Sequence, residues 1–199
     1  MPTSDVEVAT EVLTLLGDAA ITVLTEDSDR ARAVNRLYTP TLDQALRGHD
    51  WNFARMRAAL GRLSAVPEFG YSYMYQLPQD PLCLRVLTTN LNADERWEVE
   101  IYKTTDGSAQ YRVILTDATA IEIRYIARIT DPTLWDPLFA DAFVHELARR
   151  VAYAITRNAT LTESLRVATI DKWREARSVD GQESRALKRF LSSSFTIVR

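Results

Sequence analysis

The sequence predicts an α+β protein: a helical bundle with an inserted antiparallel β-sheet domain and an extended C-terminal arm. Three observations predict this class. Apolar residues recur at helical spacing in residues 1–68 and again in 130–180, whereas residues 69–129 alternate apolar and polar side chains as strands do. Residues 181–199 follow neither period. The expected domains are therefore a bundle of 1–68 with 130–180, a β insertion over 69–129, and an arm over 181–199.

Two helices are expected before the β insertion. Ser4, with a glutamate three residues later, has the spacing of a capping box that starts the first helix. Gly17 suits the position just after its end. Either Asp27 or Ser28 caps a second helix, whose apolar stripe runs to about residue 46. Pro40 falls inside that stripe, so we expect it to kink or split the helix.

The β insertion opens with alternating tyrosines. Tyr71, Tyr73 and Tyr75 are each two residues apart, which in one extended strand places all three rings on one face. Prolines in the segment 78–81 stop this strand. Asp106-Gly107 predicts a hairpin turn. Alternating segments then suggest an antiparallel meander of about five strands, with the later ones near residues 82–86, 97–102, 111–115 and 121–125.

The second half of the bundle begins with a long helix, expected from about Leu134 to Arg157. Its apolar residues step by four along one wide stripe, which is typical of a central core helix. Thr160 and the glutamate three residues later predict another capping box, and that last helix should end near 179–181. The expected core anchors of the bundle are Trp51, Phe53, Phe139, Phe143 and Leu147.

Three blocks of residues resemble the head-to-tail adaptor family of short-tailed phages, in that family's order. The first block comprises Leu46-Arg47, His49, Trp51-Asn52-Phe53-Ala54 and Arg57-Ala58. The second comprises Gly70-Tyr71, Tyr73, Tyr75, Leu77-Pro78, Asp80 and Leu84-Arg85-Val86. The third comprises Tyr125, Asp131-Pro132, Leu134-Trp135-Asp136, Phe139 and Leu147-Ala148. Asp50 departs from the pattern, because proline is expected after the histidine. The last forty or so residues match no motif.

The resemblance implies a virion structural protein rather than an enzyme. Such a protein would form a dodecameric ring between the portal protein and the tail nozzle protein, extend the DNA channel and help to retain packaged DNA. The implied partners are the portal, the nozzle protein and further copies of this chain, while packaged DNA would pass without sequence-specific binding. The implied location is the neck or tail of the virion, after synthesis in the host cytoplasm. No cofactor is implied.

Composition fits a soluble protein. The 199 residues carry a net charge of −3, which gives no general attraction to nucleic acid. The single cysteine, Cys83, excludes an intramolecular disulfide and agrees with a reducing cytoplasm. The first residues are acidic where a signal peptide would be basic, and no apolar run approaches the ~18 residues that span a bilayer. We therefore expect neither a leader nor a membrane partner.

Three pairs of side chains have the chemistry of a catalytic or metal site. His49-Asp50 resembles an acid–base pair, but a turn with a satisfied histidine is the favoured interpretation. Asp141 and His145 have metal-ligand spacing on a helix but lack a third ligand, so a surface ion pair or a capped core histidine is favoured.

Glu98 and Glu100 share a strand face, as the paired carboxylates of a glycosidase would, although solubilising carboxylates are commoner there. They would also suit arginines on other strands or a neighbouring subunit. A tail-associated glycan hydrolase is thus one alternative function. A nucleic-acid-binding module is another, and it would require the arginines of residues 149–177 to line one surface.

The C-terminal arm mixes basic and bulky apolar residues, which suits a docking segment, although a disordered terminus remains an equal alternative. In the docking interpretation the positive side chains contact acidic groups of the portal and the apolar ones fill pockets on it. The candidate portal-binding residues are Arg185, Lys188, Arg189, Phe190, Leu191 and Phe195.

Overall fold

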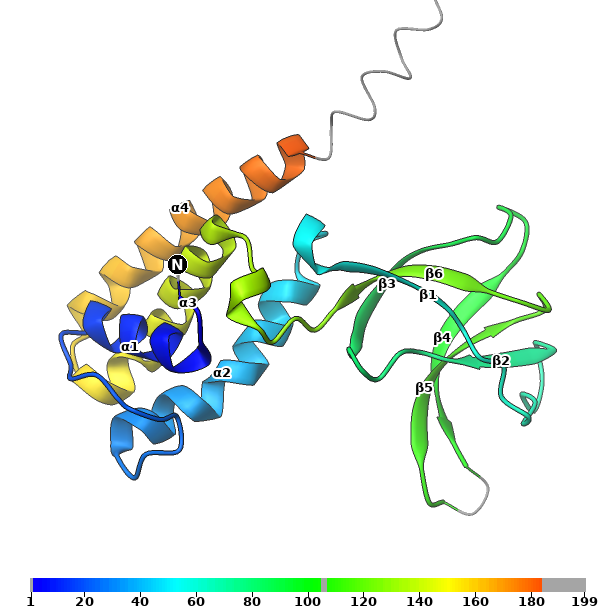
Figure 1. The fold of residues 1–199 in the computed structure, drawn as a ribbon, viewed down its shortest axis with the longest axis horizontal. Helices are drawn as coiled ribbons and strands as arrows, with labels where there is room; N and C mark the ends of the chain where they lie inside the picture. The colour runs from blue at the N-terminus through cyan, green and yellow to red at the C-terminus, as the bar shows by residue number, and fades with distance from the viewer. Residues whose placement is uncertain (1, 105–106, 184–199) are drawn as a thin grey trace, which may run out of the picture. The chain divides into compact units, whose positions relative to one another are not determined.

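The computed structural model describes residues 2–104 and 107–183 and confirms the α+β class (Figure 1). The chain forms two compact units. The helical unit combines the chain up to Phe53 with the chain from Ile129 onward, and the β unit spans Ala54–Arg128. The β unit thus begins at Ala54 rather than Phe69, because residues expected in the bundle form its first strand.

The first two helices are α1 (Asp5–Leu15) and α2 (Asp29–Arg47). Ser4 caps α1 by accepting a hydrogen bond from the Glu7 N–H at 3.2 Å. Ser28, rather than Asp27, caps α2. Pro40 does not split α2, which runs without interruption on both sides of it. A single missing hydrogen bond is tolerated there because the helix buries a long apolar stripe.

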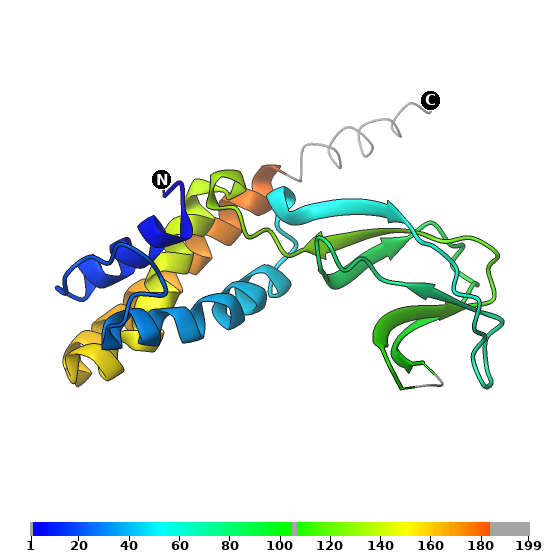
Figure 2. The same ribbon diagram turned by 60° about the horizontal axis from the view of Figure 1, so that its bottom comes forward.

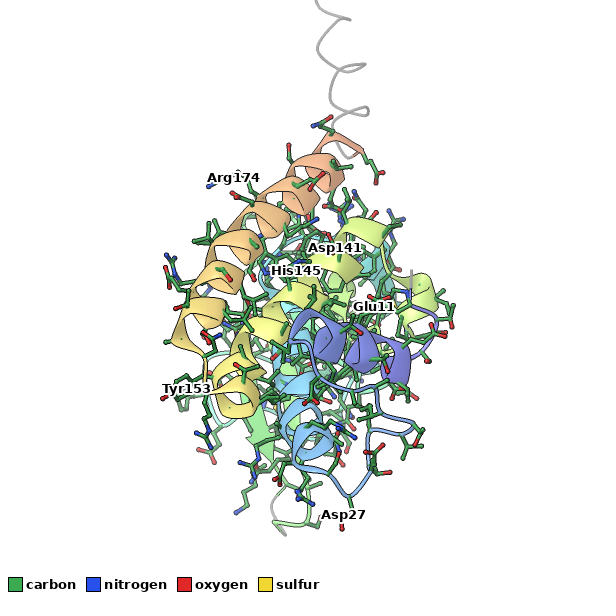
Figure 3. The ribbon with its side chains drawn as sticks, turned by 90° about the vertical axis from the view of Figure 1, so that its left-hand side faces the viewer. Glu11, Asp27, Asp141, His145, Tyr153 and Arg174 are labelled. Atoms are coloured by element: carbon green, nitrogen blue, oxygen red, sulfur yellow. The ribbon has the colours of Figure 1, made fainter. Side chains whose placement is uncertain are left out.

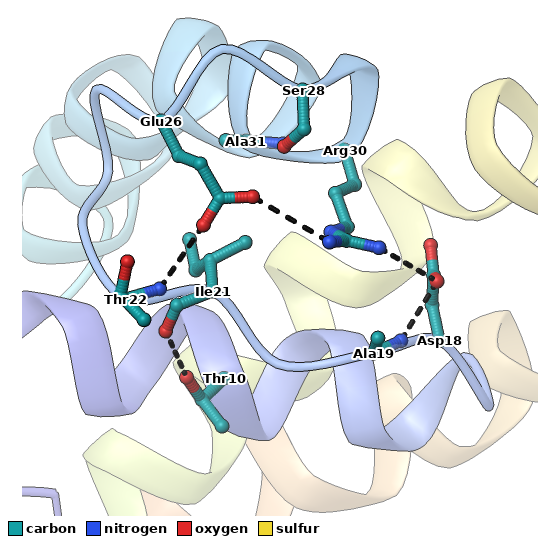
Figure 4. Close-up of polar contacts among 9 residues, drawn as sticks. All are labelled: Thr10, Asp18, Ala19, Ile21, Thr22, Glu26, Ser28, Arg30 and Ala31. Carbon is teal, nitrogen blue, oxygen red and sulfur yellow. Dashed lines mark hydrogen bonds and ion pairs between the residues drawn. The ribbon is translucent and has the colours of Figure 1, made fainter.

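Polar contacts organise the loop between α1 and α2 (Figure 4). The Arg30 guanidinium lies between two carboxylates, 3.6 Å from Asp18 Oδ1 and 3.5 Å from Glu26 Oε1. Glu26 also accepts the Thr22 N–H at 3.2 Å, and this backbone hydrogen bond is the main reason that the pKa of Glu26 is lowered. Gly17, at φ +72°, begins the loop in a conformation that favours glycine.

Helix α3 (Pro137–Thr156) starts three residues later than expected. Asp136 accepts hydrogen bonds from the N–H groups of Leu138 and Phe139, so it is the N-cap, and Pro137 occupies the first helical position. The preceding residues Pro132–Leu134 form a separate short 3-10 turn. Arg157, in the left-handed conformation, ends the helix.

Helix α4 (Ala159–Glu183) differs from the prediction at both ends. Asn158 accepts the Leu161 N–H at 3.0 Å, so the first turn is capped by Asn158 rather than by Thr160. The helix passes through Gly181 and continues to Glu183. The helix continues past Gly181 because Asp180 lies on the buried side of α4. There the Asp180 side chain accepts a hydrogen bond from Asn52, outside the helix. The segment expected as an arm from residue 181 therefore begins as helix.

The β unit contains two three-stranded antiparallel sheets instead of one meander (Figure 2). One sheet has the order β1-β6-β3 and the other β2-β5-β4. The strands are β1 (Arg55–Ala59), β2 (Tyr73–Gln76), β3 (Cys83–Thr89), β4 (Trp97–Lys103), β5 (Gln110–Thr116) and β6 (Glu122–Ala127). Only β4 and β5 are neighbours both in sequence and in a sheet. Alternation identified the strands, but it does not determine which strands pair.

The tyrosines at the start of the β unit do not all share a face. Strand β2 begins at Tyr73, so Tyr71 precedes the strand and packs against the cluster of Met74, Val113 and Leu115. Tyr75 lies on the opposite face of β2 from Met74, is fully buried, and donates its hydroxyl to the Ala118 carbonyl at 2.8 Å. The prediction failed at Tyr71 because this residue lies before the strand, where the alternation of faces does not apply.

Candidate functional site

An aromatic cluster forms the centre of the helical unit. Trp51 is fully buried, and its ring centroid lies 5.0 Å from that of Phe139 and 5.9 Å from that of Trp173. Its indole Nε1–H donates to the Ala45 carbonyl at 3.0 Å, so the one polar atom of the ring is satisfied. The ring of Trp135 lies 5.5 Å from Phe139 on the far side of the cluster. Segments far apart in the sequence thus meet around Phe139.

The five expected core anchors all lie in or beside this cluster. Trp51, Phe139, Phe143 and Leu147 are fully buried, and Phe53 is half-buried with its ring 4.9 Å from Phe139. Sequence reasoning did not include Trp135 and Trp173 among the anchors. For the first of these, a tryptophan directly before the N-cap Asp136 was a usable signal.

A buried carboxylate joins the end of α4 to the segment before the β unit. The Asp180 side chain is 5% exposed; its Oδ2 lies 2.9 Å from His49 Nε2, and its Oδ1 accepts the Asn52 N–H at 2.8 Å. The Asn52 side-chain amide in turn donates to the Asp180 carbonyl at 2.8 Å. The His49 ring also contacts Trp51 edge-on at 4.5 Å. The favoured interpretation of His49 as a satisfied histidine agrees with this geometry.

The sequence held a signal for Asp180 that was missed. Leu165, Thr169, Trp173, Ala176 and Asp180 are spaced by four, four, three and four residues, so Asp180 continues the inward stripe of α4. A charged residue at an inward position requires a buried partner. The sequence alone did not identify that partner, because His49 lies more than a hundred residues away.

Asp141 and His145 form part of an ion pair network between α3 and α4 (Figure 3). Asp141 Oδ1 lies 3.2 Å from His145 Nδ1, and Asp141 Oδ2 lies 2.6 Å from Lys172 Nζ. The hydrogen bond to Asp141 raises the pKa of Lys172, so the lysine stays charged. Of the two favoured interpretations, the capped histidine fits this geometry, because His145 Nδ1 also lies 2.9 Å from the Asp141 carbonyl oxygen, and the ion pair of Asp141 is made with Lys172. Among residues 2–104 and 107–183, no group of three or more His, Cys, Asp or Glu residues is placed to hold a metal ion.

The arginines of residues 149–177 do not present an unpaired basic surface. Within the described part of the chain, four of them pair with carboxylates on their own helix and the other two lie over aromatic rings. The ion pairs are Arg149 and Arg150 with Glu146, Arg166 with Glu163, and Arg174 with Asp171, while Arg157 lies over Tyr153 and Arg177 over Trp173. These contacts count against the nucleic-acid-binding alternative, which needed those charges on one open face.

Glu98 and Glu100 line a surface hollow of about 380 Å³ on the β2-β5-β4 sheet. Its floor is apolar, and Phe69 and Ile101 at its edge are 85% and 72% exposed. Lys103 also lines it. Both glutamates are exposed, so neither has the desolvated environment that the general acid of a glycosidase requires. Within the described residues neither forms an ion pair.

A second hollow, of about 460 Å³, lies on the β1-β6-β3 sheet and is lined by two arginines. Arg57 of β1 stands directly opposite Arg124 of β6, so the two positive side chains project from the same face. Neither forms an ion pair with a described residue, although Glu122 also lines the hollow. The Nε atom of Arg124 is buried and has no hydrogen-bond partner.

The six candidate portal-binding residues, Arg185, Lys188, Arg189, Phe190, Leu191 and Phe195, lie outside the described residues. The same holds for Asp106 of the expected hairpin turn, although Gly107 has the positive φ of +72° that such a turn uses. In the described part of the chain, no helix is long and apolar enough to cross a membrane.

Comparison with known proteins gives no assignment: no protein-family model matches the sequence, and no curated protein matches it.

Proposed function

We propose that this protein is a head-to-tail adaptor of a short-tailed phage. In this role it is a structural component of the virion, and copies of it form a ring between the portal protein and the tail nozzle protein. The ring extends the channel through which DNA passes and helps to retain the packaged genome. The protein performs no catalytic step in this role.

One observation carries the proposal. The residues that resemble the adaptor family come from separate parts of the chain, and two of the blocks meet in one core. Trp51 and Phe53 of one block pack 5.0 Å and 4.9 Å from Phe139 of another, and Trp135 lies 5.5 Å from the same ring. This convergence in one core supports the view that the resembling residues form one structural unit.

The chemistry of the described side chains supports a structural role. His49 and His145 are each paired with a carboxylate inside the helical unit, which suits residues that hold elements together. Glu98 and Glu100 are exposed on a strand, a position that suits contact with another molecule. No specific feature favours the glycan hydrolase.

The test is binding to portal rings. The full chain should co-sediment with rings of the portal protein encoded in the same genome, and electron microscopy should show an added layer at the narrow end of each ring. A variant ending at Glu183 retains the whole of α4 but lacks Arg185–Arg199 and the serine before them. If the arm is the portal dock, this variant should keep the melting temperature of the full chain and lose co-sedimentation.

Two results would count against the proposal or its parts. Absence of binding by the folded full chain would contradict the adaptor function. Full-affinity binding by the variant ending at Glu183 would keep the adaptor function but remove the arm as its dock. Release of reducing sugars from a capsular polysaccharide by the purified protein would favour the hydrolase instead.

A further inference from the structure

Two surfaces of the β unit carry charges of opposite sign that form no ion pair among the described residues, although Glu98 forms a side-chain hydrogen bond with Tyr71. We name the first the acidic surface: Glu98 and Glu100 of β4, with the exposed side chain of Phe69, which lines the same hollow. We name the second the arginine surface: Arg57 of β1 and Arg124 of β6, which line the hollow on the other sheet. The two surfaces belong to different sheets, and no ion pair joins them within the described chain.

We infer that the acidic surface of one copy binds the arginine surface of the next copy. This inference rests on the proposed function, which requires each subunit to contact two neighbours. An interface between two different patches is heterologous, and repetition of it through a closing rotation generates a ring. A single self-complementary patch would instead stop at a dimer.

Charge is the first argument for a second copy as the partner. Arg57 and Arg124 stand directly opposite each other across two strands, an arrangement that costs stability because like charges repel. The cost is removed when carboxylates approach them, and arginine forms paired hydrogen bonds with carboxylates. Glu98 and Glu100 are two residues apart on one strand and therefore present two carboxylates from the same face.

Each surface also includes one residue of the opposite charge, and these two residues are opposite in sign to each other. Lys103 lines the acidic hollow and Glu122 lines the arginine hollow. Each surface thus carries a majority of one sign with one charge of the other. A simple polyanion such as DNA would meet Glu122 as a repulsive group, whereas the acidic surface of another copy brings a lysine. This difference favours a copy of the chain over nucleic acid.

Apolar residues supply the second argument. Phe69 is 85% exposed, which is unusual for so large an apolar side chain. The arginine hollow has a small apolar lining from Ala58, Ala59 and Ile123, and its volume of about 460 Å³ accommodates an aromatic ring. A phenyl ring there would lie among the guanidinium groups at the rim, in the manner of a cation–π contact.

Charge reversal in two separate variants tests the inference. One variant carries Arg57→Glu with Arg124→Glu, and the other carries Glu98→Arg with Glu100→Arg. Either variant alone places like charges across every contact, so self-association in sedimentation velocity at low salt should weaken by at least about tenfold relative to the unmodified chain. An equimolar mixture restores opposite charges at every contact of an alternating ring, so association should return.

Matched controls separate this effect from misfolding and from net charge. Asp94→Arg and Arg62→Glu, made as two separate variants, shift the net charge in opposite directions at exposed residues of the β unit outside both surfaces, and neither should change association. Melting curves of the reversed variants establish that they are folded. As an independent variant, Phe69→Ala should weaken association without changing the melting temperature, because the ring is exposed in the single chain.

The outcomes distinguish this inference from the proposed function. Recovery of association in the mixture, with no binding to portal rings by any form, would keep the interface and reject the adaptor. Normal portal binding and normal ring formation by both reversed variants would keep the adaptor and overturn the interface. Loss of binding to a labelled DNA duplex by the Arg57→Glu, Arg124→Glu variant, with self-association unchanged, would also overturn it by assigning the arginines to phosphate.

Discussion

The helical unit and the β unit use their charged residues differently. In the helical unit many charged side chains form ion pairs with one another. Arg30 pairs with two carboxylates, Glu146 pairs with two arginines, and Asp141 pairs with a lysine. In the β unit, Arg57, Arg124, Glu98 and Glu100 are left without ion pairs among the described residues. The two units thus differ in how these charged side chains are used: those of the helical unit pair with one another, and these four of the β unit do not.

This difference in ion pairing indicates that charged residues of the two units have different roles. An ion pair that bridges two helices stabilises the fold modestly and fixes how the helices pack. An unpaired charge on an open sheet gives the fold nothing and becomes useful only when a partner arrives. We therefore expect substitutions in the helical unit to change stability, and charge substitutions in the β unit to change assembly.

The largest effect on stability is expected at the centre of the helical unit. Trp51→Ala removes a fully buried indole that contacts Phe139 and Trp173. The variant should lose about 3–5 kcal/mol of unfolding free energy, measured by chemical denaturation, because a large cavity replaces the ring. The conservative control Trp51→Phe keeps an aromatic ring and should lose less. A loss under about 1 kcal/mol for the alanine variant would show that the cluster is not the core.

The next largest effect is expected at Asp180. Asp180→Ala leaves the Asn52 N–H and the His49 ring without their buried acceptor. A cost of about 1–3 kcal/mol is expected, because a buried donor that loses its partner is costly. Asp180→Asn is the control, since its side-chain oxygen still accepts one hydrogen bond and should preserve part of the stability. An unchanged melt in Asp180→Ala would mean that α4 does not need this anchor.

Sequence reasoning found the helices, the strand segments and the main core residues because each follows from local periodicity. It placed Trp51, Phe139 and Phe143 in the core correctly. It did not determine that β1 pairs with β6, or that Asp180 meets His49, because partners distant in sequence leave no periodic trace. The cap at Ser4 was predicted correctly because a glutamate three residues later completes the expected spacing, whereas the same spacing at Thr160 misled, since Asn158 caps that helix.

A third prediction concerns acid sensitivity. Burial pushes the pKa of Glu146 upward, but hydrogen bonds from Arg149 and Arg150 outweigh burial, so the pKa lies below its usual value of 4.5. A carboxyl whose pKa is lowered on folding adds stability that is complete above pH 4.5 and is lost as the pH falls through the folded value. Denaturation at several pH values should therefore show a smaller loss of stability on acidification for Glu146→Gln than for the unmodified chain. If the free energy of unfolding fell equally with pH in both proteins, this prediction would be wrong.

The smallest effect on stability is expected from Glu98→Gln combined with Glu100→Gln, and this variant separates the two units most sharply. Both carboxylates are exposed on β4, and the substitution keeps their size while removing their charge. Exposed substitutions of this kind change unfolding free energy by within about 0.5 kcal/mol. The melt should therefore overlay that of the unmodified chain, while self-association and assembly on portal rings weaken, because the arginine surface of the neighbour loses its anionic partners.

A tail-associated hydrolase gives a different result: the same pair of substitutions would abolish sugar release and leave assembly intact. A fall in melting temperature with assembly unchanged would instead place these glutamates among the groups that stabilise the β unit itself, and the contrast between the two units would fail.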